Sequence, residues 1–175
     1  QDLIFVIPLV LYFKDWRKIT SFLWGVFLGF LPQLLIWKII FGEIRSPYLI
    51  YGHEFFWLKP KIMEVLFSKN NGLFYYSPIL ILGWLGLVGV KEKYWARAGI
   101  FLFFAQLYII ASWFMWWGGA GYGGRMFISL MPFFILGLGN LLEKSKSLGK
   151  LKIIIIISFI ILNFYSMIKF LILSP

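Results

Sequence analysis

The sequence predicts an all-α protein: a polytopic transmembrane helix bundle with about five full spans, one truncated span and a short interfacial helix in an outer loop. Two observations predict this class. First, 61% of the 175 residues are hydrophobic and the mean hydropathy is +0.86, whereas soluble domains are roughly 45–50% apolar. Second, the basic residues form short clusters between long apolar segments, as topology signals do in membrane proteins.

Six apolar segments follow one another: 3–13, 19–41, 73–90, 98–116, 126–142 and 153–172. The first has only 11 residues, whereas a spanning helix needs about 17–25. Its basic neighbours follow it, whereas those of a signal peptide precede the apolar region. We therefore interpret 3–13 as the end of a truncated helix. Residues 1–175 are then a single transmembrane domain, expected to be the C-terminal part of a longer chain.

The charges of the connecting loops predict the orientation. Loops 14–18, 91–97 and 143–152 contain 10 of the 17 basic residues, so the positive-inside rule places them in the cytoplasm. Loops 42–72 and 117–125 then face outward. The Ile- and Lys-rich composition is typical of bacteria, which predicts the bacterial plasma (inner) membrane. A formal charge of +10 divided in this way does not indicate a nucleic-acid partner.

Loop 42–72 is long for a simple connection, so we expect it to be a structured external loop. Pro60 suits the first turn of a helix, and Asn70-Asn71-Gly72 is a stop signal. The pattern predicts a short helix over 60–69 on the outer membrane surface, with Ile62, Val65 and Leu66 on one face.

Small and polar residues inside the apolar segments indicate helix packing. Gly25 and Gly29 form a Gly-x-x-x-Gly pair, and glycines recur every three residues at Gly83, Gly86 and Gly89. Such residues let helices approach closely in lipid. Isolated polar side chains at membrane depth are expected to form hydrogen bonds between helices; these are Gln33, Gln106 and Asn163.

The strongest functional signal is the turn from Trp116 to Arg125, which contains five glycines. Glycines let backbone N–H groups approach an anion, and a guanidinium binds phosphate oxygens with a bidentate fork. We predict that Arg125, Gly123 and Gly124 bind a lipid phosphate. A tight external turn with an interfacial arginine is the alternative.

Two further stretches are candidates for binding substrate. Tyr75, Tyr76 and Ser77 offer hydroxyl groups before Pro78, although an aromatic belt with a kink would have the same pattern. His53 and Glu54 are adjacent polar groups in an aromatic external segment. They could line a substrate site, act in acid–base catalysis or have a structural role.

The chain lacks the sequence motifs of several common enzyme classes. It has no cysteine, one histidine and seven acidic residues, and it contains no Walker loop, dinucleotide fingerprint or nucleophile elbow. No metal ligands are predicted, although a divalent ion stays an open alternative.

Two blocks resemble polytopic membrane glycosyltransferases of the GT-C type, in particular bacterial relatives of protein O-mannosyltransferases and aminoarabinose transferases. One block runs from Trp57-Leu-Lys-Pro60 to Gly72-Leu-Phe-Tyr-Tyr-Ser-Pro78, and the other from Trp116-Trp-Gly-Gly119 through Tyr122-Gly-Gly-Arg125 to Pro132. The likeness covers most of residues 42–142. Gly124 stands where many relatives have proline.

The resemblance implies transfer of a sugar from a polyprenyl-phosphate donor to a lipid, glycan or protein acceptor on the outer face of the membrane. It implies that Arg125 holds the donor phosphate, that Tyr76, Trp117 and Tyr122 shape the pocket, and that His53 and Glu54 lie near the acceptor. The catalytic carboxylate is expected in an external loop upstream of this chain. A lipid or lipid-linked sugar flippase and a non-catalytic membrane assembly subunit are the alternatives.

Overall fold

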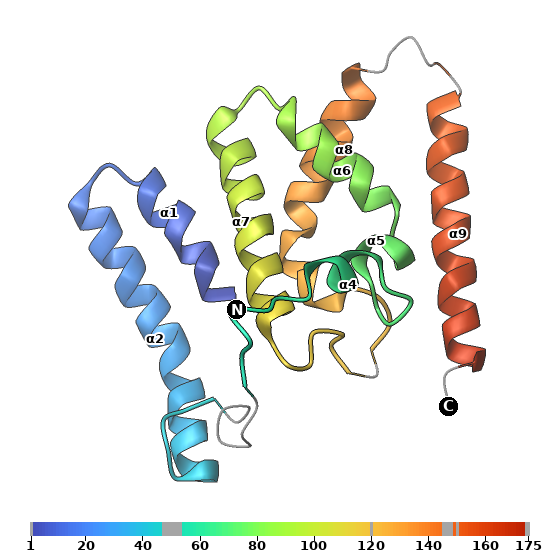
Figure 1. Ribbon diagram of the computed structural model, residues 1–175. Helices are drawn as coiled ribbons and strands as arrows, with labels where there is room; N and C mark the ends of the chain where they lie inside the picture. The colour runs from blue at the N-terminus through green and yellow to red at the C-terminus, as the bar shows by residue number, and fades with distance from the viewer. Residues whose placement is uncertain (1, 47–53, 120, 145–148, 150, 174–175) are drawn as a thin grey trace.

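The computed structural model describes residues 2–46, 54–119, 121–144, 149 and 151–173. Over these residues the protein is helical, and the only extended pairing is one isolated antiparallel bridge between Phe55 and Trp113. The predicted all-α class is confirmed. Figure 1 shows α7, α6 and α8 at the centre of the molecule, with α1 and α2 on one side and α9 on the other.

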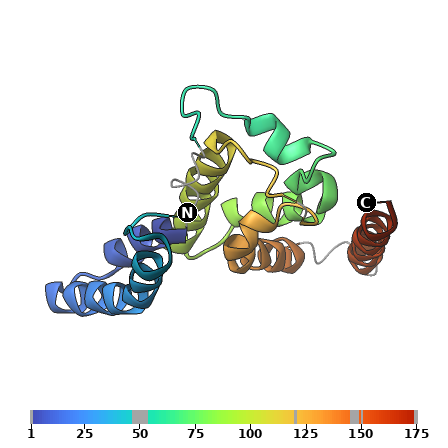
Figure 2. The ribbon, with the colours of Figure 1, turned by 90° about the horizontal axis from the view of Figure 1, so that it is seen from below.

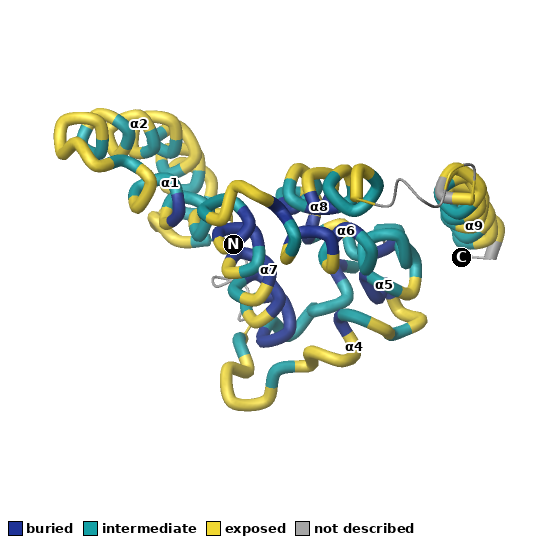
Figure 3. Tube along the Cα trace, turned by 90° about the horizontal axis from the view of Figure 1, so that it is seen from above, coloured by how far each residue is buried: buried dark blue, intermediate teal, exposed yellow. Residues whose placement is uncertain are grey.

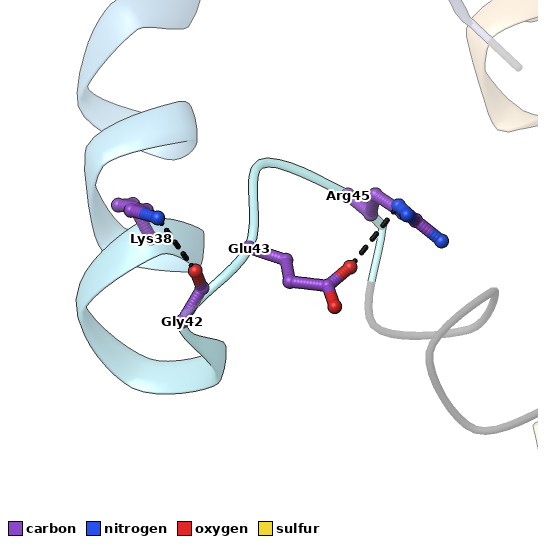
Figure 4. Close-up of polar contacts among 4 residues, drawn as sticks. All are labelled: Lys38, Gly42, Glu43 and Arg45. Atoms are coloured by element: carbon purple, nitrogen blue, oxygen red, sulfur yellow. Dashed lines mark hydrogen bonds and ion pairs between the residues drawn. The ribbon is translucent and has the colours of Figure 1, made fainter.

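The chain begins with a helical hairpin made of η1 (Asp2–Phe5), α1 (Val6–Tyr12) and α2 (Trp16–Phe41). The Asp15 carboxylate caps α2 by accepting from the backbone N–H of Arg17 at 2.9 Å. Gly42 ends α2 because its φ of 75° is left-handed, a conformation that glycine adopts without a steric penalty. In the last turn of α2, Lys38 donates to the Gly42 carbonyl at 2.7 Å. After the helix, Arg45 forms an ion pair with Glu43 at 3.0 Å (Figure 4).

The segment predicted as one span at 73–90 is divided into two helices, α5 (Leu73–Tyr76) and α6 (Ile79–Val88). Pro78 explains the break, because a proline disfavours helical backbone at the preceding residue and offers no N–H donor. Ser77 accordingly leaves the helical region, with φ −133° and ψ 65°.

Four described helices are long and apolar enough to cross a membrane: Trp16–Phe41, Lys93–Ser112, Arg125–Lys144 and Ile153–Ile172. The helices over Asp2–Tyr12 and Ile79–Val88 are apolar but shorter. These helices support the prediction of a membrane protein. The structure has four helices of spanning length among the described residues, whereas the sequence predicted about five full spans.

The core forms where α7 (Lys93–Ser112) packs against η2 (Arg125–Leu130), α8 (Met131–Lys144) and two short helices, α4 (Ile62–Phe67) and α5. Its most deeply buried large side chains include Phe127, Leu73, Leu102 and Ile110. In contrast, the apolar windows of α2 and of α9 (Leu151–Leu173) contain no buried residue. Figure 3 shows both helices mainly exposed or intermediate, which suits helices that contact lipid.

The glycine pattern on α6 is confirmed as a packing surface. An added methyl group at Gly83 would lie 2.7 Å from the Phe134 carbonyl oxygen of α8, and one at Gly137 would overlap the Gly83 carbonyl oxygen. The two helices therefore meet backbone to backbone. Gly25 and Gly29 differ, because added methyl groups there would meet no atom within 4 Å.

Two of the three isolated polar residues join elements as predicted. Gln106 is fully buried on α7 and donates to the Met126 carbonyl at 2.6 Å and to the Ser129 hydroxyl at 3.1 Å. Asn163 on α9 donates to the Tyr76 carbonyl at 2.7 Å. Gln33 is exposed on α2.

The outer loop contains the expected short helix, α4 (Ile62–Phe67), which is shorter than the predicted 60–69. Val65 is buried and Leu66 is half-buried, whereas Ile62 is exposed, so the apolar face is narrower than predicted. The backbone N–H of Lys61 donates to the Ala111 carbonyl at 2.9 Å and holds the loop against the end of α7. In Figure 1 the α1–α2 and α6–α7 turns lie at one end of the molecule, and α4 and α5 lie toward the other.

Candidate functional site

The two predicted outer loops are joined by one side chain. Asn71 is buried, and its Nδ2 donates to the carbonyl oxygens of Trp117 at 2.9 Å and Gly119 at 3.0 Å. Its φ of 64° is left-handed, which asparagine tolerates better than most residues. The stop signal after α4 and the glycine-rich turn after α7 therefore form one structural unit.

The last helix is held against this unit by polar contacts. Asn163 Nδ2 donates to the Ser77 hydroxyl at 3.0 Å as well as to the Tyr76 carbonyl, and the Tyr122 hydroxyl donates to the Asn163 carbonyl at 3.1 Å. The Phe170 ring meets the Tyr122 and Tyr76 rings at centroid distances of 5.5 and 6.5 Å. These contacts place one face of α9 beside α5, at the edge of the molecule in Figures 1 and 2.

A cavity of about 820 Å³ lies between α9 and the joined loops, within the range of small-ligand sites. Its walls come from three separate parts of the chain. They are Lys69, Asn70, Asn71, Tyr75 and Tyr76; Trp117 and Gly119; and Leu162, Tyr165, Ser166, Lys169 and Phe170.

The chemistry of this wall favours an anion with an apolar attachment. Lys69 and Lys169 supply two cations from opposite walls, and no carboxylate is among the lining residues. Asn70, Tyr75 and Ser166 add hydrogen-bonding side chains, while Leu162 and Phe170 make the α9 side apolar. Uncompensated cations in a cleft attract anions, and the exposed apolar surface of α9 offers a path for a lipid chain.

Tyr122 lies next to the cavity wall, where its ring contacts that of Phe170. Burial raises the pKa of its phenol above the ordinary value, and the neighbouring Tyr76 raises it further. A hydrogen bond with Ser166 acts in the opposite direction. The Tyr122 hydroxyl donates to the Asn163 carbonyl.

The three residues predicted to bind phosphate lie close to the cavity but outside its wall. Arg125 is exposed and donates to the Gly118 carbonyl, and its Nη2 lies 3.7 Å from the position of an added methyl group at Gly119. Gly124 lies against α5, where an added methyl group would be 2.8 Å from Leu73 Cδ1, and one at Gly123 would be 3.4 Å from Tyr76 Cβ. These glycines allow close packing of the turn, and their role in phosphate binding stays a prediction.

The predicted substrate-binding residues divide into three groups. Tyr76 and Trp117 line the cavity, while Ser77 and Tyr122 support it through their hydrogen bonds with Asn163. Glu54 lies elsewhere: it is exposed, and its carbonyl accepts from the Phe114 N–H at 3.2 Å. His53 lies outside the described residues.

Sequence reasoning missed Lys169, which is the cation from the α9 wall. A signal was present, because Tyr165, Ser166 and Lys169 recur at helical spacing and place polar groups on one face of an otherwise apolar span. An intramembrane cation on such a face is a functional-site signal.

The described residues contain no group of three histidine, cysteine or acidic side chains placed to hold a metal ion. Comparison with protein-family models, curated proteins and solved structures finds no match for this chain.

Proposed function

We propose that this chain is the membrane portion of a glycosyltransferase that binds a polyprenyl-phosphate sugar donor on the outer face of the membrane. The observation that carries the proposal is the cavity between α5, the 117–119 turn and α9, with Lys69 and Lys169 in its wall and no carboxylate. Two residues of the motif blocks that resemble GT-C enzymes, Tyr76 and Trp117, also line it.

The proposed role of the chain is to hold the leaving group. When the sugar is transferred, its anomeric carbon–oxygen bond to the phosphate breaks and a bond to an acceptor oxygen forms. Negative charge then develops on the lipid phosphate, where Lys69 and Lys169 would stabilise it. A base outside the residues that line this cavity takes the acceptor proton, and the resemblance assigns that base to an upstream external loop.

The test uses the full-length protein in proteoliposomes with a radiolabelled polyprenyl-phosphate sugar. Lys169→Gln and Lys69→Gln should each weaken donor binding by about tenfold, since each removes a charge-assisted contact with phosphate. Arg125→Ala should abolish transfer while the protein stays folded in the membrane. Arg45→Ala is the matched control, because Arg45 is an exposed arginine in the other outer loop, paired with Glu43 away from the cavity (Figure 4).

Normal donor binding by both lysine variants would contradict the assignment of the cavity. Near-normal transfer by Arg125→Ala would contradict the role of Arg125. A flippase of lipid-linked sugar is the second candidate, because a basic cavity beside the proline-broken segment α5–α6 would also suit transport of such a lipid. Flux of labelled donor across the membrane, without transfer to an acceptor, would support that function instead.

A further inference from the structure

A second cavity lies on the other side of the molecule, between α1 and α7. It has a volume of about 390 Å³, which is within the range of ligand sites. Five of its lining residues are apolar: Ile7, Pro8, Leu11, Ala98 and Phe101. Tyr94 and Arg97 complete the wall. Neither the resemblance nor the proposed function uses these residues.

The two walls are held at a defined separation. The Tyr94 hydroxyl donates to the Pro8 carbonyl, which bridges α7 and α1. The Tyr12 ring lies 5.3 Å from that of Tyr94 and 5.2 Å from that of Trp95. Aromatic side chains of this kind gather where the hydrocarbon of a bilayer meets its headgroups. The aromatic cluster therefore marks the headgroup end of the cavity.

The apolar side chains of this cavity are exposed at the surface of the described structure. Leu11 and Ile7 lie on α1, which is mainly apolar, and their side chains are 71% and 45% exposed. Phe101 on the facing helix is 47% exposed. An acyl chain could enter between these side chains from the bilayer, and it would cover apolar surface that the described part of the chain leaves open.

Positive charge is concentrated at the headgroup end. Arg97 is exposed and is the only charged residue among those that line the cavity. Lys93 lies one helical turn before it, and Lys14 follows the end of α1. Glu92 is the single acid of loop 91–97. The positive-inside rule places this loop in the cytoplasm, where the membrane leaflet is rich in anionic lipids.

From this combination we propose that the α1–α7 cavity binds an anionic phospholipid of the cytoplasmic leaflet. Its phosphate lies at the Arg97 guanidinium and one acyl chain lies along Ile7, Leu11 and Phe101. The guanidinium suits this task because it binds phosphate oxygens in a bidentate manner and keeps its charge. The proposal is independent of the donor site on the outer face.

Native mass spectrometry of the full-length protein tests this, with phosphatidylglycerol and phosphatidylcholine of identical acyl chains as probes. We expect preferential binding of phosphatidylglycerol. Arg97→Gln should weaken it about tenfold, and Arg97→Lys should weaken it less because the charge is retained. Glycerol 3-phosphate should not compete, because it has the headgroup chemistry without the chains.

Arg17→Gln is the matched control, since Arg17 is an exposed arginine in the neighbouring cytoplasmic loop and does not line the cavity. It should bind phosphatidylglycerol as the wild type does. Equal loss in Arg17→Gln and Arg97→Gln would overturn the proposal in favour of general surface attraction. Unchanged binding by Arg97→Gln, equal binding of the two lipids or competition by glycerol 3-phosphate would also overturn it. Circular dichroism of each variant shows whether it is folded.

Discussion

The side-chain amide of Asn71 donates a hydrogen bond to the backbone carbonyl of Trp117, 46 residues further along the chain, at 2.9 Å. This contact and its companion at Gly119 hold the end of the outer loop against the turn that follows α7. The cavity between these segments and α9 includes Asn71, Trp117 and Gly119 in its wall. The geometry of the candidate site therefore depends on a buried amide whose role is to join two loops.

Two substitutions at Asn71 should distinguish what its hydrogen bonds contribute to stability from what its backbone conformation contributes. Asn71→Gly removes the amide but keeps a residue suited to φ 64°, and we expect it to lower the free energy of unfolding by about 1–3 kcal/mol. Asn71→Ala should cost about 1 kcal/mol more, because alanine is strained in the left-handed region. Melting temperatures measured in detergent show whether Asn71→Ala is less stable than Asn71→Gly. Equal melting temperatures for the two variants would contradict the prediction.

The α6–α8 contact should not accept a methyl group. Gly137→Ala places its Cβ against the Gly83 carbonyl oxygen, so the helices must separate. We expect a loss of about 1–3 kcal/mol or more in stability. Gly139→Ala on the same helix is the matched control, because its Cβ would meet nothing within 4 Å. Its better helix propensity should leave stability unchanged or raise it by up to about 1 kcal/mol. Similar losses in both variants would refute the packing argument.

The buried amide of Gln106 should contribute to stability, whereas that of Gln33 should not. Gln106→Leu removes donors to Met126 and Ser129, and interhelical hydrogen bonds in membranes contribute about 0.6–1.7 kcal/mol. We expect a decrease of about that size in the free energy of unfolding. Gln33→Leu, made at an exposed position of α2, should be neutral or stabilising. The free energies of unfolding are compared by titration with a denaturing detergent. An unchanged free energy of unfolding for Gln106→Leu would show that its hydrogen bonds contribute little.

The raised pKa of Tyr122 predicts a dependence of stability on alkaline pH. Because the folded state holds the phenol proton more tightly than the unfolded chain, the contribution is complete below the ordinary tyrosine pKa of about 10. It is lost as the pH rises through the raised pKa of the folded state. Melting temperatures measured from pH 8 to pH 11 should therefore fall more steeply for the wild type than for Tyr122→Phe. Parallel curves would contradict the assignment.

The position of α9 should depend on Asn163. Asn163→Leu removes its hydrogen bonds to the Tyr76 carbonyl and the Ser77 hydroxyl, while leucine suits the apolar surroundings of a spanning helix. We expect the protein to stay folded and the cavity wall from α9 to be displaced, so that donor binding weakens by about tenfold. Ser158→Leu is a control on the same helix, because the Ser158 hydroxyl donates within α9, to the Ile154 carbonyl. Donor affinity that is equal in both variants would contradict this role for Asn163.

The sequence by itself determined the properties that depend on local composition. Apolar runs of sufficient length predict spanning helices, and clusters of lysine and arginine predict their ends, because both signals act through the solvent that each segment contacts. Pro60, Asn71 and Gly72 likewise predicted a short helix between them, since turn chemistry depends on a few adjacent residues, although α4 (Ile62–Phe67) is shorter than the predicted 60–69. Even the break at Pro78 had a local cause, although its effect, two helices in place of a span, needed the structure.

Only the tertiary structure decided which segments share a site. The cavity between α5, the 117–119 turn and α9 combines residues near positions 70, 118 and 166. Their meeting depends on which face of α9 turns toward Tyr76 and Ser77. Helical periodicity places Tyr165, Ser166 and Lys169 on one face of α9. It does not say which segment that face meets, because lipid and a protein interior attract the surrounding apolar residues equally. The long-range hydrogen bonds of Asn71 and Asn163 hold these segments together. As a result, Lys69 and Lys169 lie in the wall of the same cavity.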